Sequence, residues 1–223
     1  MQTMWFDACI FDLDGVIVDT AKYHFLAWKR LADMLDIPFS EKENEKLKGV
    51  SRLASLEIIL ELSGKKYTDS EKAKFAEMKN TWYVEFVSRM TPSEILPGAI
   101  ELLTDLKSHG IKTAIGSASK NTLLILEKIR IKDLFDTVTD GNMVKSAKPD
   151  PEIFLVTASI LNVKPEKCIV FEDSVAGIKA AHKAGMYGIG VGNKEILIEA
   201  DYVINDLSEM SFLKLTALKT INQ

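Results

Sequence analysis

The sequence is short of cysteine, of positive charge and of long apolar runs, and each shortage excludes a class of protein. Its 223 residues include only two cysteines, Cys9 and Cys168, both in apolar segments. Two buried thiols indicate a reducing cytoplasm rather than a disulfide framework. The net charge of −4 is mild and acidic, so the composition indicates no nucleic-acid partner.

Apolar runs that could enter a membrane are also missing. No run approaches the roughly 20 residues needed to span a bilayer. Asp7 and Asp12 interrupt the N-terminal apolar stretch, so we expect no signal peptide and no membrane partner. Internal repeats and low-complexity tracts are absent as well. With 47% hydrophobic and 27% charged residues, the composition is typical of a folded, soluble protein.

One long block, residues 18–92, has helical sequence patterns and no convincing strand. Ser40 with Glu43, and Thr68 with Glu71, have the spacing of capping boxes and mark two helix starts. Before them, apolar residues recur with a helical period over residues 22–35. The helices expected in this block lie over 22–35, 52–62 and 70–90. The block therefore predicts an all-helical domain.

The remaining segments, 1–17 and 93–223, alternate short apolar strands with helices. Strands are expected over 5–11, 111–116, 136–140, 168–171, 187–191 and 202–204. Helices are expected over 98–109, 121–130, 151–161, 175–185 and 207–220. This alternation predicts an α/β domain with a parallel sheet covered on both faces. The helical block is then an insertion directly after the first strand.

Polar residues follow the expected strands, where open parallel sheets bind their ligands. The segment FDLDGVIVDT, residues 11–20, places two aspartates directly after the first strand. The polar residues at the strand ends or in the loops that follow them are Asp12, Asp14, Ser117, Lys148, Glu172 and Asp173. A lone aspartate after a strand is typical of a helix cap, and Asp19 has this simpler explanation. A cap does not explain the whole set.

The composition of this set points to phosphate chemistry. Four carboxylates repel one another unless a cation lies among them, and their oxygens are the ligands that Mg²⁺ prefers. Magnesium keeps open positions for water and phosphate, which indicates a phosphate substrate. Lys148 and Ser117 are suited to phosphoryl oxygens. One aspartate could attack phosphorus, and the other could transfer a proton.

Four motifs in this order resemble the haloacid dehalogenase superfamily of phosphotransferases, namely FDLDGVIVDT, GSASKN, AKPDPEIF and FEDSVAGIKAAHKAG. The segments DTAKYHFLAWKRLA, LKGVSRLASLEIIL and KNTWYV are similar to the β-phosphoglucomutase family within it. The resemblance implies a Rossmann-like parallel sheet core, 1–17 and 93–223, with an inserted all-helical cap domain, 18–92. It also implies a monomer that acts on a small sugar phosphate.

The implied reaction interconverts β-glucose 1-phosphate and glucose 6-phosphate through an aspartyl-phosphate and a bisphosphate that turns around in the site. Closure of the cap would exclude water, which hydrolyses an aspartyl-phosphate. The alternative is a Mg²⁺-dependent sugar-phosphate phosphatase of the same superfamily, in which water is the phosphoryl acceptor. A non-catalytic binding protein and a dehalogenase are the weaker alternatives, because neither needs both aspartates of the first motif.

The resemblance also implies roles for the core residues. Asp12 would be the nucleophile, and Asp14 the general acid and base whose backbone carbonyl also helps to bind Mg²⁺. The carboxylates of Asp12, Glu172 and Asp173 would bind the metal. The residues that would contact the transferring phosphoryl group or the substrate from the core are Ser117, Lys148, Ala118, Ser119 and Asn121. Gly116 and Val18 depart from the family pattern, in which Ala and Thr are common there.

In the cap, the resemblance implies that Arg52 grips the second, non-transferring phosphate. Lys79 and His24 would contact the sugar or help to place Asp14, and Thr20 lies at the hinge. The remaining cap candidates for substrate contact are Gly49, Val50, Ser51 and Trp28. Taken alone, Lys79 is typical of a solvated lysine, and the ring of Trp28 is typical of a cap core. A basic Arg52 opposes the dipole at a helix start, which favours a phosphate-binding role.

Overall fold

The computed structural model describes residues 4–47 and 50–221 and divides into two compact units. Unit 1 comprises Met1–Asp19 and Thr91–Gln223, and unit 2 comprises Thr20–Met90. The divisions fall within two residues of the boundaries that the sequence pattern suggests. Each unit is described separately below.

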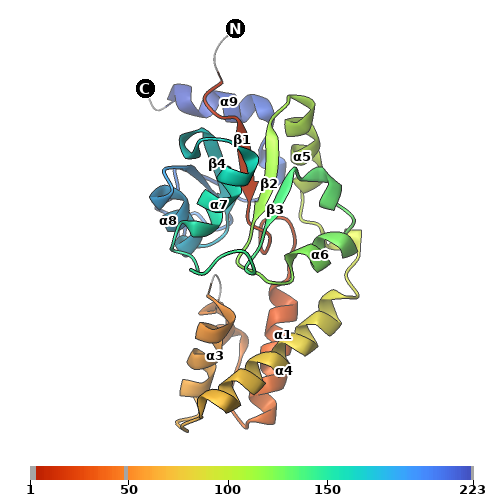
Figure 1. The fold of residues 1–223 in the computed structure, drawn as a ribbon, viewed down its shortest axis with the longest axis vertical. Helices are drawn as coiled ribbons and strands as arrows, with labels where there is room; N and C mark the ends of the chain where they lie inside the picture. Colours follow the sequence, from red (N-terminus) through yellow and green to blue (C-terminus); the bar gives the residue numbers. More distant parts are fainter. Residues whose placement is uncertain (1–3, 48–49, 222–223) are drawn as a thin grey trace. The chain divides into compact units, whose positions relative to one another are not determined.

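Unit 1 is built on a six-stranded sheet with the order β3-β2-β1-β4-β5-β6, in which all neighbouring strands are parallel (Figure 1). The strands are β1 Ala8–Phe11, β2 Lys112–Gly116, β3 Thr137–Thr139, β4 Cys168–Glu172, β5 Tyr187–Val191 and β6 Tyr202–Ile204. The central strands β1 and β4 are buried along their whole length. Their continuous apolar sequences suit this position, because helices cover both faces of a parallel sheet.

Helices connect these strands. They are α5 Ala99–Ser108, α6 Thr122–Lys128, α7 Glu152–Leu161, α8 Val175–Lys183 and α9 Phe212–Ile221. Short 3₁₀ helices lie at η1 Pro92–Glu94, η2 Lys132–Leu134, η3 Pro165–Lys167 and η4 Leu207–Glu209. Helices α7 and α8 bury their apolar sides against one face of the sheet, whereas α5 packs on β2 and α9. Within the described residues, no helix is long and apolar enough to cross a membrane.

The two cysteines lie on opposite faces of this sheet. Cys168 pairs with Ala8 across β4 and β1, and both belong to the apolar cluster under α7 and α8. Because successive side chains of a strand point to opposite faces, Cys9 points the other way. Burial raises the pKa of the Cys168 thiol to about 12. Both cysteines are free and buried, as the sequence predicted.

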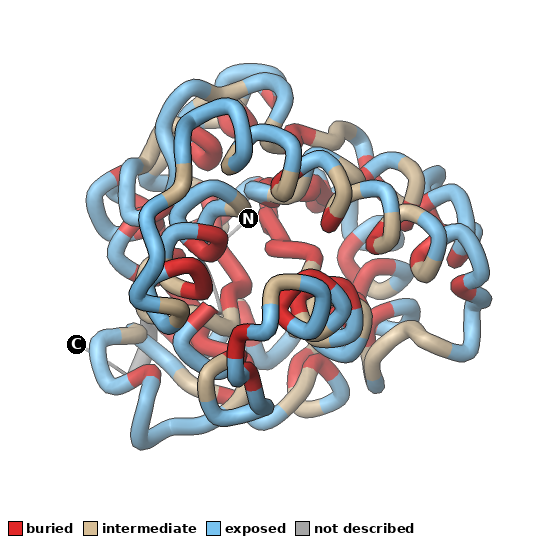
Figure 2. The backbone as a smooth tube through the Cα atoms, turned by 90° about the horizontal axis from the view of Figure 1, so that it is seen from below, coloured by how far each residue is buried: buried red, intermediate tan, exposed pale blue. Residues whose placement is uncertain are grey.

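Unit 2 is helical, with α1 Ala21–Met34, α2 Glu41–Glu45, α3 Arg52–Glu61 and α4 Asp69–Val87. Both predicted capping boxes are confirmed at the starts of α2 and α4. Buried and exposed residues are interspersed along these helices, and Figure 2 draws buried residues of the chain in red and exposed ones in pale blue. The described part of unit 2 contains no strand, as expected.

Two predicted elements differ from the structure. The first strand is expected over 5–11 but begins at Ala8, and the indole of Trp5 instead donates a hydrogen bond to the carbonyl of Leu215 in α9. The single helix expected over 207–220 is divided into η4 and α9. At the start of α9, Ser211 accepts a hydrogen bond from the amide of Lys214, and Asp105 of α5 accepts one from the amide of Phe212.

Gly98, the residue before α5, combines a positive φ of 79° with a close backbone approach. A Cβ atom there would lie 2.0 Å from the backbone nitrogen of Ser208. Gly110, after the same helix, has a φ of 73° and no atom within 4 Å of such a Cβ. The two positions therefore share the backbone conformation and differ in the available space.

We expect Gly98→Ala to lower the free energy of unfolding by at least about 2 kcal/mol more than Gly110→Ala. Both variants force an alanine into the left-handed region, at about 1–2 kcal/mol, but only the first also drives a methyl group into backbone. Urea denaturation measures the difference. Equal losses in the two variants would show that backbone conformation alone requires glycine at position 98.

Candidate active site

The strand register of unit 1 brings the ends of β1, β2 and β4 together. Phe11, the last residue of β1, pairs with Ile115 of β2 and with Phe171 of β4. The next residue, Asp12, donates its backbone amide to the carbonyl of Phe171 over 2.9 Å. Asp12 therefore lies beside Glu172, as expected for neighbouring carboxyl ends in a parallel sheet.

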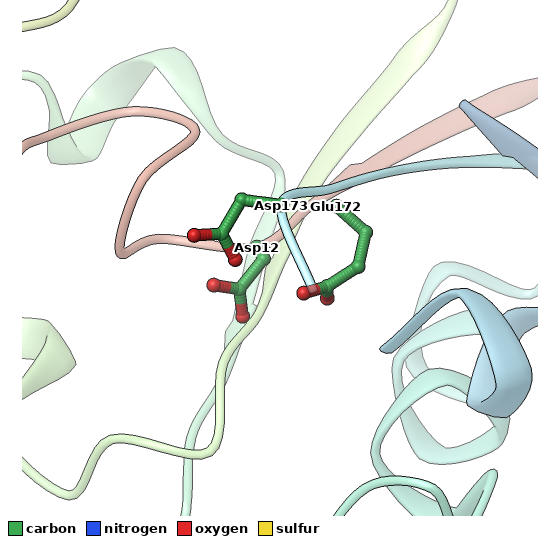
Figure 3. A group of neighbouring side chains, drawn as sticks. All are labelled: Asp12, Glu172 and Asp173. Atoms are coloured by element: carbon green, nitrogen blue, oxygen red, sulfur yellow. The ribbon is translucent and has the colours of Figure 1, made fainter. Parts of the chain in front are cut away.

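Three carboxylates gather at this edge, those of Asp12, Glu172 and Asp173, which we call the carboxylate group. One oxygen from each lies within 4.8 Å of the others. Figure 3 shows the side chains turned toward a common space, with Asp12 on the loop after β1 and the other two at the end of β4. Asp12 and Glu172 are buried, at 7% and 1% exposure. Such an arrangement of hard oxygen donors fits a divalent cation such as Mg²⁺.

Lys148 brings one positive charge to this group. Its Nζ donates to Oδ1 of Asp12 over 2.5 Å and to Oε2 of Glu172 over 2.7 Å. Burial alone would lower the pKa of the ammonium, but the two carboxylates raise it above its usual value. Lys148 therefore stays charged, as a buried lysine can only when it is paired.

One lysine does not balance three carboxylates. Burial, acting with the charges of Glu172 and Asp14 and against that of Lys148, raises the pKa of Asp12 to about 7. Burial and the neighbouring carboxylates likewise raise the pKa of Asp173 to about 9. Without a second cation, these two carboxyl groups therefore hold protons near neutral pH more readily than ordinary aspartates do, and a bound divalent cation would favour their ionised forms.

Asp14 is not a member of the carboxylate group, but its charge raises the pKa of both Asp12 and Asp173. It is half-buried on the loop after β1 and is not one of the three residues whose oxygens lie within 4.8 Å. The next residue, Gly15, has a φ of 78°, and a Cβ there would lie 2.2 Å from Oδ2 of Asp173. Glycine therefore allows the loop that carries both aspartates to approach β4. The sequence analysis did not assign a role to Gly15, although the glycine that follows the two aspartates was a visible signal.

Glu172 is held by residues that the sequence analysis also left without a role. Its Oε1 accepts hydrogen bonds from the amide and the hydroxyl of Ser174, at 3.1 and 2.7 Å. Ser174 in turn caps α8 by accepting from the amide of Gly177 over 3.1 Å. A Cβ on Gly177 would lie 1.9 Å from the carboxyl carbon of Glu172. The spacing Ser-x-x-Gly at a helix start could have indicated this support.

The loop after β2 carries Ser117, which is fully buried. Its hydroxyl accepts a hydrogen bond from the amide of Ser119 over 3.1 Å, and Ser119 accepts from the amide of Asn121 over 3.3 Å. The loop after β3 is hydrogen-bonded to the loop after β2, because the side-chain amide of Asn142 donates to the carbonyl of Lys120. Ala118 is exposed. A hydroxyl that accepts a hydrogen bond can still donate its own proton, so Ser117 is suited to contact a phosphoryl oxygen.

The loop before Lys148 is fixed by Glu152, another residue that the sequence analysis passed over. Its Oε2 accepts from the amides of Lys145 and Ser146, at 3.0 and 2.7 Å. These backbone hydrogen bonds lower the pKa of the Glu152 carboxyl. Asp150 accepts the amide of Glu152 over 3.0 Å and so starts α7. An acidic residue shortly after the lysine in AKPDPEIF was the available signal.

Unit 2 contains a separate cluster of expected substrate residues. Lys79 is only 2% exposed, and its Nζ lies 3.0 Å from Nδ1 of His24. Its ammonium lies 4.6 Å from the ring centroids of Trp28 and Tyr83. Burial, together with the charges of Lys79 and Arg52, lowers the pKa of His24 well below its usual value. Lys79 is therefore no solvated lysine.

The other cap candidates lie at helix starts in unit 2. Ser51 caps α3 by accepting from the amide of Ala54 over 3.3 Å, and Arg52 is the first helical residue, as predicted. Thr20 is buried just before α1, and Val50 is exposed. Gly49 lies outside the described residues.

Comparison with known proteins places these features in a family. A model of the haloacid dehalogenase-like hydrolase family matches residues 6–185. The β-phosphoglucomutase of Bacillus subtilis is 46% identical over 206 residues, 92% of this chain and 91% of that protein. The phosphorylated carbohydrates phosphatase of Thermotoga maritima is 35% identical over 205 residues, 88% of this chain and 92% of that protein.

A solved structure agrees with these relatives. The crystal structure of β-phosphoglucomutase from Clostridium difficile matches with a TM-score of 0.91 at 44% identity, and the match covers 98% of this chain and 100% of that one. The family match extends over well more than half of the chain, including the whole helical insertion. The chain belongs to the haloacid dehalogenase-like hydrolase family.

Proposed function

We propose that this protein is a β-phosphoglucomutase, which interconverts β-glucose 1-phosphate and glucose 6-phosphate. The observation that carries the proposal is the 46% identity to the Bacillus subtilis enzyme over almost the full length of both chains. The buried carboxylate group with Lys148 supplies matching chemistry at the strand ends. The free, buried cysteines suit a reducing cytoplasm, where we propose that the enzyme acts as a monomer.

Asp12 and Asp14 divide the chemistry in this proposal. Asp12 carries the phosphoryl group, and the 6-hydroxyl of β-glucose 1-phosphate attacks phosphorus while Asp14 accepts the hydroxyl proton. The bond from phosphorus to Asp12 breaks, which leaves the 1,6-bisphosphate. After the bisphosphate turns around, Asp12 attacks the phosphate at position 1, and Asp14 returns its proton to the departing sugar oxygen. Glucose 6-phosphate leaves, and Asp12 carries a phosphoryl group again.

The remaining core residues stabilise this transfer. Lys148 keeps Asp12 oriented, and with Ser117 it would hold the phosphoryl oxygens. The carboxylates of Asp12, Glu172 and Asp173, with the backbone carbonyl of Asp14, would hold Mg²⁺, which supplies positive charge to the carboxylates and phosphoryl oxygens. The proposed substrate contacts from the loop after β2 are Ala118, Ser119 and Asn121.

In unit 2 we assign the second phosphate to Arg52. Arg52 is the first residue of α3, and burial lowers the pKa of its guanidinium while Glu77 and Tyr83 oppose the shift. Lys79 and His24, already paired, would contact the sugar hydroxyls. The ring face of Trp28 would support the ammonium group of Lys79, which lies over it. The cap loop would contribute Gly49, Val50 and Ser51, and Thr20 would act at the hinge.

A phosphatase is the second candidate, because the Thermotoga maritima relative carries that name at 35% identity. The two functions differ only in the acceptor, a sugar hydroxyl or water. We expect purified protein with Mg²⁺ and a trace of β-glucose 1,6-bisphosphate to form glucose 6-phosphate much faster than it releases phosphate. Removing Mg²⁺ with a chelator, or the change Asp12→Ala, should abolish both activities. Rapid phosphate release without isomerisation would instead support the phosphatase.

The change Asp14→Asn tests whether Asp14 transfers the proton while Asp12 carries the phosphoryl group. We expect turnover to fall about 10²–10⁴-fold, because the amide cannot transfer the proton. Binding of Mg²⁺, measured by calorimetry, should change little, since the three carboxylates remain. Turnover within a few-fold of the unchanged protein would remove Asp14 from the proton-transfer role.

The change Arg52→Ala tests the assignment of the second phosphate. In a small aryl phosphate the single phosphoryl group is the one transferred to Asp12, so no second phosphate is left for this guanidinium to bind. We therefore expect isomerisation to fall at least about tenfold, in keeping with one lost charge-assisted hydrogen bond, while hydrolysis of a small aryl phosphate is nearly unchanged. Lys74→Ala, which removes an exposed cation of the same unit, is the matched control. Equal losses on both substrates would exclude the assignment.

A further inference from the structure

The ammonium of Lys148 has a third neighbour besides its two carboxylates. The ring of Phe154 lies 4.9 Å from Nζ, measured to the ring centroid. Lysine offers a compact charge on a flexible four-carbon stem, so its position depends on what surrounds its end. Two hydrogen bonds pull it toward Asp12 and Glu172, and the aromatic ring lies within the range of a cation–π contact.

Phe154 is well placed to act as a rigid support. It lies in the first turn of α7 and is fully buried. It belongs to the apolar cluster that joins α7 and α8 to the sheet, together with Ile10 and Ala114. Its ring is therefore held by the core of unit 1, independently of the charges that it faces.

Gly116 leaves room for this ring. It is the last residue of β2, directly before Ser117, and its φ is not in the left-handed region, so the backbone does not require glycine. A Cβ there would lie 3.1 Å from Cδ1 of Phe154 and 3.0 Å from Cγ2 of Ile10, both tighter than ordinary contacts. The missing side chain at this position therefore allows the ring to lie at the end of the sheet.

We propose that Phe154 is a positioning residue for phosphoryl transfer, which acts through Lys148 by holding its ammonium against the carboxylate group with the face of the ring. The contact is stronger here than on a surface, because a cation–π attraction grows when the cation is removed from water. The ring also covers one side of the ammonium that water would otherwise reach. The inference rests on the proposed phosphomutase function.

Fluorinated phenylalanines at position 154 test this role without changing the shape of the core. Successive fluorine atoms weaken the negative charge on the ring face and leave the packing almost unaltered. We expect kcat for isomerisation to fall stepwise along the mono-, di- and trifluoro series, by about 5- to 30-fold at the end. The melting temperature should stay nearly constant. In protein labelled with ¹⁵N-lysine, the Nζ resonance of Lys148 should shift in the same order.

The same series at Phe6 is the matched control, since that ring is also fully buried in unit 1 and packs against Trp5 and Phe212. We expect no trend there. A constant kcat across the series at position 154, or an equal decline at Phe6, would overturn the proposal and leave Phe154 as core packing. The proposed function is tested separately by the unsubstituted protein, whose failure to isomerise the sugar phosphate would refute that function first.

Discussion

The contact of Lys148 with Asp12 and Glu172 is the interaction on which the rest of the site depends. Asp12 and Lys148 are 136 positions apart in the chain and meet in a buried space at the end of the sheet. Two carboxylates that face each other in such a space destabilise the fold unless a cation separates them. Removing one partner of a buried ion pair typically costs about 3–5 kcal/mol, so this lysine contributes to folding as well as to chemistry.

With all three members ionised, the carboxylate group would carry more negative charge than Lys148 can balance. The protein retains this imbalance by fixing each side chain in place, as Ser174 does for Glu172 and Glu152 does for the loop before the lysine. Raised pKa values at Asp12 and Asp173 are the sign of this constraint. A site held in this way is ready to receive a divalent cation and a phosphate, because little reorganisation is needed when they bind.

Unit 2 also holds a buried lysine in place, but with aromatic rings and a histidine rather than with carboxylates. Lys79 is buried between two aromatic rings and beside His24, whose pKa is lowered so that the ring stays neutral next to two cations. Ordinary surface lysines are not enclosed in this way. The rings therefore support a cation in each unit, Trp28 and Tyr83 under Lys79 and Phe154 beside Lys148.

The sequence by itself determined the order of strands and helices, the two capping boxes at Ser40 and Thr68, and the polar residues at the strand ends. These features are local, because periodicity, capping and strand length are written in neighbouring residues. Even the weak strands β3 and β6 were recognised in this way. The core motifs also identified the family, since four of them occur in a fixed order.

Only the tertiary structure decided which of those residues meet. Strand register set Asp12 beside Glu172 and left Asp14 outside the carboxylate group. The burial of Lys79 and the ring beside Lys148 depend on helices packing against distant segments, which no local pattern records. The start of α9 includes another such contact, the hydrogen bond from the amide of Phe212 to Asp105 more than one hundred positions away. Local sequence specifies elements, whereas contacts between distant segments specify charge, burial and reactivity.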